Sequence, residues 1–133
     1  MSHQDETFFT SVGCMDGRVH DPVTNYGIDK FHALYADTIT EAGLVGLLAK
    51  EQIDKELLDS LRYKIGISIT KHSSKGMVIH GHQECAGNPV DDQKHQKDIL
   101  RALDVLRNFT PDDFEIKPVF VVRKGSSWEI EEL

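Results

Sequence analysis

The sequence predicts an α/β fold with three layers, in which a mostly parallel sheet is flanked by helices. Short apolar segments alternate with longer segments whose apolar residues recur every three or four positions. The first pattern is typical of buried strands and the second of amphipathic helices, and their alternation favours parallel strands joined by helices. The chain has 133 residues, which fits one core, so residues 1–133 are expected to form a single domain.

The predicted strands are short apolar segments bounded by residues that interrupt the pattern. The parallel strands are residues 8–13, 35–39, 77–80 and 119–122. After the turn sequence Lys124-Gly-Ser-Ser127, residues 128–130 are expected to return as an antiparallel edge strand. If the second strand pairs on one side of the first and the third on the other, the strand order is 2-1-3-4, with the antiparallel strand at the edge.

The helical patterns lie between the strands. From Leu44 to about Thr70 the pattern is helical, and its glycines leave open whether it forms one helix or two. A second helix is expected to begin near Asp91, because acidic side chains in a first turn interact favourably with the helix dipole, and to end at Thr110-Pro111.

The segment after the first strand is predicted to be irregular. Residues 13–18 are rich in turn-forming residues, and Asp21-Pro22 is expected to keep the following stretch out of regular helix. The pattern of residues 25–33 leaves open a loop or a short helix.

The composition of the chain indicates which partners and which cellular compartment to expect. A net charge of -7 disfavours nucleic acid and anionic membrane surfaces as partners. The apolar runs are much shorter than the ~20 residues that span a bilayer, so no membrane segment is expected. Residues 1–7 are mostly polar and do not resemble a signal peptide, and two cysteines cannot build a disulfide framework. We therefore expect a cytoplasmic protein.

A candidate metal site is formed by residues that follow two predicted strands. His82 and Cys85 stand three positions apart just after residues 77–80, and Cys14, the only other cysteine, directly follows residues 8–13. Thiolate and imidazole are ligands that zinc prefers, and a catalytic zinc site needs three protein ligands. We expect Cys14, His82 and Cys85 to share a Zn2+ ion, with water or a nearby carboxylate in the fourth position.

The strand order explains how these distant residues can meet. In the order 2-1-3, a switch point lies between the first and third strands, and open α/β sheets bind ligands just outside the carboxyl ends of the strands at such a point. Cys14 lies beyond the first strand, while His82 and Cys85 lie beyond the third, so their side chains are expected to converge there.

Asp16 and Arg18 are the candidate catalytic residues. Asp16 stands two residues after Cys14, and Arg18 two residues further on. A guanidinium can hold a carboxylate by paired hydrogen bonds, so Arg18 would keep Asp16 ionised and away from the metal. Asp16 could then orient a metal-generated hydroxide toward a small electrophile. The alternative is a structural zinc site that Asp16 closes as the fourth ligand.

These motifs carry a resemblance to a known family. Cys14-Met-Asp16-Gly-Arg18 followed by Gly81-His82-Gln-Glu-Cys85 resembles the C-x-D-x-R and G-H-x-x-C signature of β-class carbonic anhydrases. The resemblance implies that Cys14, His82 and Cys85 bind zinc, and that Asp16 and Arg18 form the catalytic dyad. It also implies reversible hydration of carbon dioxide to bicarbonate, as a zinc lyase. Family members are homodimers or higher homo-oligomers, so the same assembly is expected here.

The chain departs from the usual family pattern near the expected substrate pocket. Thr40-Glu41 replaces the usual Arg-Asn before Ala42-Gly43, and His80 stands where an apolar strand residue is usual. His80 is expected to be a hydrogen-bonded neighbour of the site or a core residue. Related proteins with this fold hydrolyse carbonyl sulfide or carbon disulfide, so a hydrolase is one alternative. A non-catalytic, zinc-stabilised binding module is the other.

Overall fold

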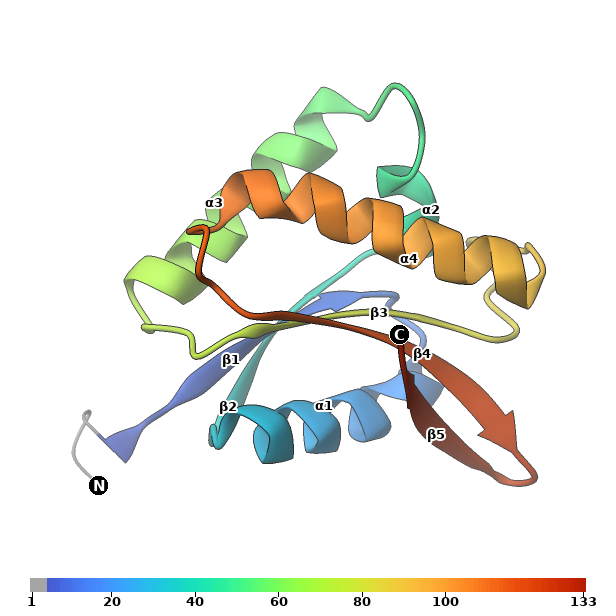
Figure 1. Cartoon of the computed structure of the whole chain (residues 1–133), viewed down its shortest axis with the longest axis horizontal. Coiled ribbons are helices and arrows are strands. Elements are labelled where there is room, and N and C mark those ends of the chain that lie inside the picture. The colour runs from blue at the N-terminus through green and yellow to red at the C-terminus, as the bar shows by residue number, and fades with distance from the viewer. Residues whose placement is uncertain (1–4) are drawn as a thin grey trace.

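A single five-stranded sheet organises the part of the chain described by the computed structural model, residues 5–133. The strand order is β2-β1-β3-β4-β5, and every neighbouring pair is parallel except β4 and β5. Helices cover both faces of this sheet (Figure 1). The predicted fold class is therefore confirmed, including the strand order and the antiparallel strand at the edge.

The first strand has the predicted bounds, and the other strands extend a little further than their apolar segments suggest. Their bounds are β1 Phe8–Gly13, β2 Tyr35–Thr40, β3 Met77–His82, β4 Ile116–Lys124 and β5 Ser127–Glu132. The ends of β4 and β5 lie next to a hairpin turn in which Gly125 has a φ of 64°, a left-handed conformation that glycine adopts at little cost. The turn lies between Lys124 and Ser127, where the sequence predicted it.

The helices are divided unequally between the two faces of the sheet (Figure 1). α1, Gly17–Phe31, lies on one face, while α2, Leu44–Leu48, α3, Lys55–Thr70, and α4, Asp92–Leu106, lie on the other. The helical pattern from Leu44 onward thus forms two helices, and α3 begins where Asp54 accepts a hydrogen bond from the Leu57 N–H. A short 3-10 helix, η2, Arg107–Phe109, extends α4 toward Thr110.

α1 corrects the prediction of an irregular segment after the first strand. Asp16 caps the helix by accepting a hydrogen bond from the Arg18 N–H, and Pro22 lies inside the helix. Pro22 cannot donate a hydrogen bond to the Arg18 carbonyl, so the helix loses one bond near its beginning. Burial outweighs this loss, because Val19, Val23, Gly27 and Phe31 recur every four positions and form its buried face.

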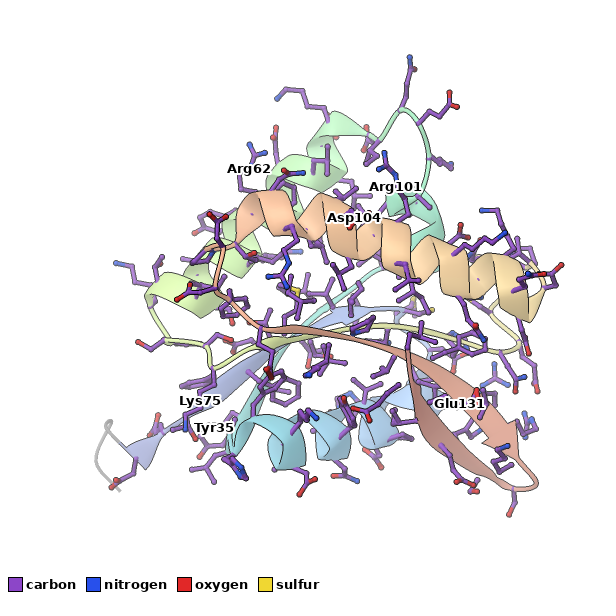
Figure 2. All side chains as sticks on the ribbon, viewed as in Figure 1. Tyr35, Arg62, Lys75, Arg101, Asp104 and Glu131 are labelled. Carbon is purple, nitrogen blue, oxygen red and sulfur yellow. The ribbon has the colours of Figure 1, made fainter. Side chains whose placement is uncertain are left out.

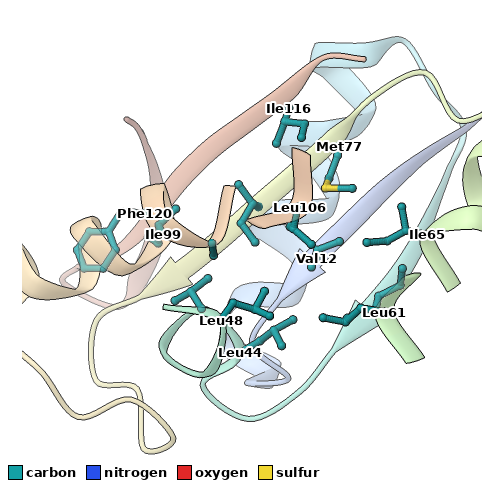
Figure 3. Packing of buried hydrophobic residues seen from close by; sticks show 14 of the residues in the cluster. Val12, Leu44, Leu48, Leu61, Ile65, Met77, Ile99, Leu106, Ile116 and Phe120 are labelled. Atoms are coloured by element: carbon teal, nitrogen blue, oxygen red, sulfur yellow. The ribbon is translucent and has the colours of Figure 1, made fainter. Parts of the chain in front are cut away.

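The two faces of the sheet carry separate apolar clusters because successive strand residues point to opposite sides. Val12, Met77, Ile79 and Phe120 pack with the helices α2 to α4 (Figure 3). The cluster on the α1 side contains the following residues: Phe9, Val19, Val23, Phe31, Ala33, Val78, Val119 and Val121. Val78 and Ile79, which are neighbours on β3, thus contribute to opposite clusters. The sheet and the helices on its two faces form three layers.

α4 illustrates how an amphipathic helix covers the sheet. The helix begins near Asp91, as predicted, and Asp91 is its N-cap, whose side chain accepts a hydrogen bond from the Lys94 N–H. Ile99 and Leu106 are fully buried, whereas Arg101 and Asp104 are exposed on the side that points away from the sheet (Figure 2). Within the described chain, no helix is both long enough and apolar enough to cross a membrane.

Candidate metal centre

The sheet brings three potential metal ligands to one edge. Gly13, the last residue of β1, pairs with His80 of β3, so Cys14 and His82 both project beyond the paired part of these parallel strands. Cys85 follows in the turn after β3, where Glu84 has a left-handed φ of 59°. The ligand atoms of Cys14, His82 and Cys85 lie within 4.8 Å of one another. This grouping could hold a metal ion at the predicted switch point.

The three side chains are shielded from solvent. Cys14 is 8% exposed, Cys85 is 5% exposed and His82 is fully buried. The Sγ atoms of the two cysteines are 3.8 Å apart, and both cysteines are free. Such a separation suits two thiolates that bind the same ion, because Zn–S bonds of about 2.3 Å in a tetrahedral site place sulfur atoms at about this spacing.

The backbone sets the tautomer of His82. Its Nδ1 lies 2.6 Å from the carbonyl oxygen of Gln83, which can only accept a hydrogen bond. Nδ1 therefore carries the proton, and the lone pair of Nε2 is free to bind a metal. Nε2 is one of the buried polar atoms without a hydrogen-bond partner among the described residues. An atom of this kind is the one expected to be satisfied by an ion.

The two thiols differ in acidity. Burial by itself would raise the pKa of Cys14, but the neighbouring His82 and the backbone N–H groups of Gly43 and Asp16 stabilise the thiolate and bring the pKa to about 7. The Gly43 nitrogen lies 3.5 Å from the Cys14 Sγ. Burial and the negative charge of Cys14 raise the pKa of Cys85. Cys14 is therefore the thiol that ionises first.

Asp16 and Arg18 form a bidentate pair beside the three potential ligands. Arg18 donates from Nε to Asp16 Oδ1 at 3.0 Å and from Nη2 to Oδ2 at 2.7 Å. These hydrogen bonds lower the pKa of Asp16 to about 2. Asp16 Oδ2 is also 3.9 Å from His82 Nε2, so an ionised carboxylate faces the candidate metal position.

A small cavity of about 110 Å³ opens next to these groups. Its lining includes Cys14, Asp16, His20, Thr38, Thr40 and His80. The volume suits a molecule of only a few heavy atoms. A larger hollow of about 500 Å³ beside Lys50 and Ile53 contains none of the three potential ligands.

Comparison with known proteins decides the family. A family model described as "Putative carbonic anhydrase" matches residues 4–133. The chain belongs to this carbonic anhydrase family. No curated protein sequence matches the chain significantly.

Solved carbonic anhydrase structures share the fold of the chain. The structure of a carbonic anhydrase from Streptococcus mutans matches with a TM-score of 0.55 and 16% identity, covering 91% of this chain and 80% of that chain. The structure of β-carbonic anhydrase isoform I from Trichomonas vaginalis matches with a TM-score of 0.52 and 14% identity, with the same coverage of 91% and 80%. At these identities, the likeness establishes the fold and not the roles of individual residues.

His80 lies on β3 and is buried within the sheet. It is 3% exposed, and its ring packs on Gly13, where an added Cβ would lie 2.3 Å from His80 Cε1. Burial, followed by the charge of His82, lowers the pKa of His80 to about 3, so the ring is neutral at physiological pH. Its Nδ1 has no hydrogen-bond partner within the described part of the chain. His80 is therefore a core residue that also lines the cavity.

His95 lies near the site, although it was not among the residues expected there from the sequence. His95 is 2% exposed on α4, and its ring centroid lies 6.3 Å from that of His82 and 5.4 Å from that of Phe120. Its position could have been inferred from helical spacing, because His95 stands four residues before the buried Ile99.

The side chain of Glu84 is exposed, and it forms ion pairs with two arginines. The carboxylate accepts hydrogen bonds from Arg18 and Arg123. The sequence contains no local signal for this contact, since Glu84 is separated from Arg18 by 66 positions and from Arg123 by 39.

Proposed function

We propose that this protein is a zinc-dependent carbonic anhydrase that catalyses the reversible hydration of carbon dioxide to bicarbonate and a proton. One observation carries the proposal: an ionised Asp16, held by two hydrogen bonds from the Arg18 side chain, faces the buried group of Cys14, His82 and Cys85. Membership of the carbonic anhydrase family supports the choice of reaction.

The donor atoms suit zinc. Two sulfur atoms and one imidazole nitrogen match a borderline-soft ion, and three protein ligands leave one position of a tetrahedral site open. Zinc, when bound, would supply the nucleophile by lowering the pKa of a water molecule. The thiol of Cys14, with its lowered pKa, would ionise readily when it binds a metal.

Asp16 would orient the nucleophile. With a pKa near 2, Asp16 remains ionised at neutral pH and can accept a hydrogen bond at Oδ2. Arg18 already occupies one side of Oδ2 and fixes the carboxylate plane. The remaining lone pair can therefore aim the nucleophile at the carbon atom of carbon dioxide in the small cavity.

We further propose that the enzyme acts as a homodimer or larger homo-oligomer in the cytoplasm. β2 is at an edge of the sheet, and the exposed fractions of Leu34 and Tyr35 at its beginning are 47% and 45%. Apolar exposure along a strand edge favours association with a second chain. The free thiols of Cys14 and Cys85 suit a reducing compartment.

Stopped-flow measurement of carbon dioxide hydration, on protein of known zinc content, tests the proposal. Asp16→Asn is expected to retain zinc and to lower kcat by about a hundredfold, the scale expected for removal of one proton-accepting group. Asparagine is also a good helix N-cap, so the beginning of α1 should be preserved. Removal of zinc with a chelator should abolish turnover, and zinc addition should restore it.

The alternative functions give different results in the same experiment. Turnover of carbonyl sulfide or carbon disulfide without carbon dioxide hydration would identify a hydrolase. Stoichiometric zinc without turnover of any of these substrates would indicate a structural site. In that case, X-ray absorption should show an Asp16 oxygen in place of water.

A further inference from the structure

Arg18 is surrounded by a cluster of side chains beside the potential metal ligands, and one of them, the Trp128 ring, lies 6.4 Å from the ring of His82. We call Glu84, Arg123 and Trp128, together with Arg18, the Arg18 clamp. Its members come from α1, the turn after β3, β4 and β5. The cluster joins four separate parts of the chain around one guanidinium.

Glu84 connects the two arginines. Its Oε1 accepts hydrogen bonds from Arg18 Nη1 at 3.2 Å and from Arg123 Nη2 at 2.9 Å, while Oε2 accepts one from Arg123 Nε at 2.7 Å. The Glu84 backbone carbonyl accepts another from Arg18 Nη2 at 3.2 Å. Since Asp16 occupies Nε and also Nη2, the three nitrogens of the Arg18 guanidinium all have acceptors.

Trp128 supports both guanidinium groups. The Cζ atom of Arg18 lies 4.9 Å from the ring centroid of Trp128, and that of Arg123 lies 4.6 Å from it. Cations at this distance from an indole face are attracted to its negative π-surface. Arg123 and Trp128 are directly paired in the β4–β5 hairpin, so the hairpin places these two residues opposite each other.

The turn that carries Glu84 is itself attached to β4. The Gln83 N–H donates to the carbonyl of Val121 at 3.0 Å, and the Arg123 N–H donates to Gln83 Oε1 at 2.8 Å. Glu84 adopts a left-handed φ of 59°, which is unusual for a residue other than glycine and marks a constrained site. The acceptor for Arg18 is thus held by backbone contacts rather than by a mobile side chain alone.

We propose that Glu84, Arg123 and Trp128 are positioning residues of the proposed reaction, which hold Arg18 so that Asp16 stays on the guanidinium and directs Oδ2 at the nucleophile. This inference rests on the proposed function. Arg18 is 41% exposed, so without these contacts its side chain could rotate into solvent. Asp16, 3.9 Å from His82 Nε2, could then move onto the metal and close the site.

A purely structural role for the clamp makes a different prediction. The side chains of Arg18, Glu84 and Arg123 are 41%, 48% and 40% exposed, and ion pairs this exposed contribute little to stability. Positioning should therefore change kcat and the mobility of Arg18 without much change in the unfolding temperature. A structural role would change the unfolding temperature and leave kcat almost unaltered.

The test compares Glu84→Gln with the control Glu129→Gln in zinc-loaded full-length protein. Both variants remove one carboxylate charge, and Glu129 lies on the same hairpin but outside the clamp. We expect Glu84→Gln to keep its zinc and its KM but to lose about tenfold in kcat, because small displacements of a positioned group are costly in rate. NMR should show that the Arg18 Nε–H exchanges with solvent faster in this variant than in the unaltered protein. Glu129→Gln should match the unaltered protein in both measurements.

Substitutions of Trp128 provide a second test, in which zinc content is also measured because the Trp128 ring lies 6.4 Å from that of His82. Trp128→Leu should lower kcat and accelerate exchange of the Arg18 Nε–H, whereas Trp128→Phe should largely retain wild-type behaviour because it keeps an aromatic face. If Trp128→Leu and Glu84→Gln both leave kcat and Nε–H exchange unchanged, the proposal is wrong.

The failure of the proposed function can be distinguished from the failure of this inference. If the unaltered protein does not hydrate carbon dioxide, the reaction is rejected, and the positioning of Arg18 is then decided by exchange alone. Faster Nε–H exchange in Glu84→Gln than in Glu129→Gln supports the clamp. Equal exchange in these two variants overturns it.

Discussion

Asp16 both caps α1 and pairs with the guanidinium of Arg18. Its Oδ1 accepts the Arg18 backbone N–H at 2.9 Å and thereby caps α1, while both carboxylate oxygens accept hydrogen bonds from the Arg18 guanidinium. The beginning of the helix and the position of the proposed dyad are therefore set by the same residue. This dual role also explains why a segment rich in turn residues continues into a helix.

Gly43 is a second residue whose local conformation affects the site. It has a φ of 62°, and an added Cβ would lie 2.3 Å from the carbonyl oxygen of Gly87. Gly43→Ala should therefore lower the free energy of unfolding by about 2 kcal/mol or more, since left-handed strain and overpacking combine. It should also weaken metal binding, because the Gly43 N–H contacts the Cys14 Sγ.

Chemical denaturation and competition with a chelator measure these two effects. Gly66→Ala is the matched control, because Gly66 lies within α3 and no heavy atom lies within 4 Å of the added Cβ. This control should stabilise the protein by about 0.5–1 kcal/mol, the difference in helix propensity. Equal stabilities of the two variants would contradict the prediction.

At the scale of elements, α1 shows that burial can outweigh an unfavourable residue. Its buried face packs on the sheet through Val19, Val23 and Phe31, and Gly27 allows the Phe9 ring to approach within 2.1 Å of an ideal Cβ position. The helix is retained although Pro22 interrupts its hydrogen bonds. Tertiary contacts therefore supply the stability that the local sequence lacks.

Pro22→Ala should increase the stability of the protein. The alanine would donate a hydrogen bond to the Arg18 carbonyl and remove the contact between the proline ring and the preceding turn. We expect a gain of about 2 kcal/mol, because a proline within a helix costs about 3 kcal/mol and its restriction of the unfolded chain offsets up to about 1 kcal/mol. Urea unfolding measures this difference, and a loss of stability would contradict the account.

At the scale of the whole molecule, both apolar clusters and the site depend on the same sheet. Val78 packs toward α1 and Ile79 toward α4, while His82 at the end of the same strand points to the candidate metal position. Two further buried histidines, His80 and His95, are incorporated into this packing, and burial lowers the pKa of both because it disfavours their charged form. The stability of the molecule is consequently expected to depend on pH.

His95 should contribute to a loss of stability in mild acid. Burial, followed by the charge of His82, lowers the pKa of His95 below the value of 6.5 that applies to an unperturbed histidine. As the pH falls below about 6.5, the unfolded chain binds a proton at this residue that the folded chain does not. The stability that neutral His95 provides is therefore present above this pH and is lost as the pH falls.

Urea unfolding at pH 7.5 and pH 5.5 measures whether the free energy of unfolding falls in acid. These two values lie about one pH unit on either side of the unperturbed histidine pKa. His95→Leu should lose less stability than the unaltered protein between these conditions, whatever its stability at neutral pH. The exposed His32 provides a control, and His32→Asn suits its left-handed φ of 53°. Equal losses for His95→Leu and the unaltered protein would refute the prediction.

The order of the strands could be predicted from the sequence, and the candidate site residues could be proposed from it. Apolar segments marked the strands, and the positions of Cys14 and His82 just after two of them indicated a shared edge of the sheet. The pair Asp16 and Arg18 could be recognised because its residues are close in the chain. All of these signals are local, or follow from simple rules of parallel sheet topology.

Features that depend on distant contacts became visible in the folded structure. Burial of one face against the sheet made α1 a helix, and packing brought His95 next to Phe120. Likewise, Glu84 meets Arg123 across 39 positions, so no local pattern could reveal the pair. The physical reason is that local sequence expresses backbone preference and side-chain chemistry, whereas burial and ion pairing depend on which distant segments the folded sheet brings together.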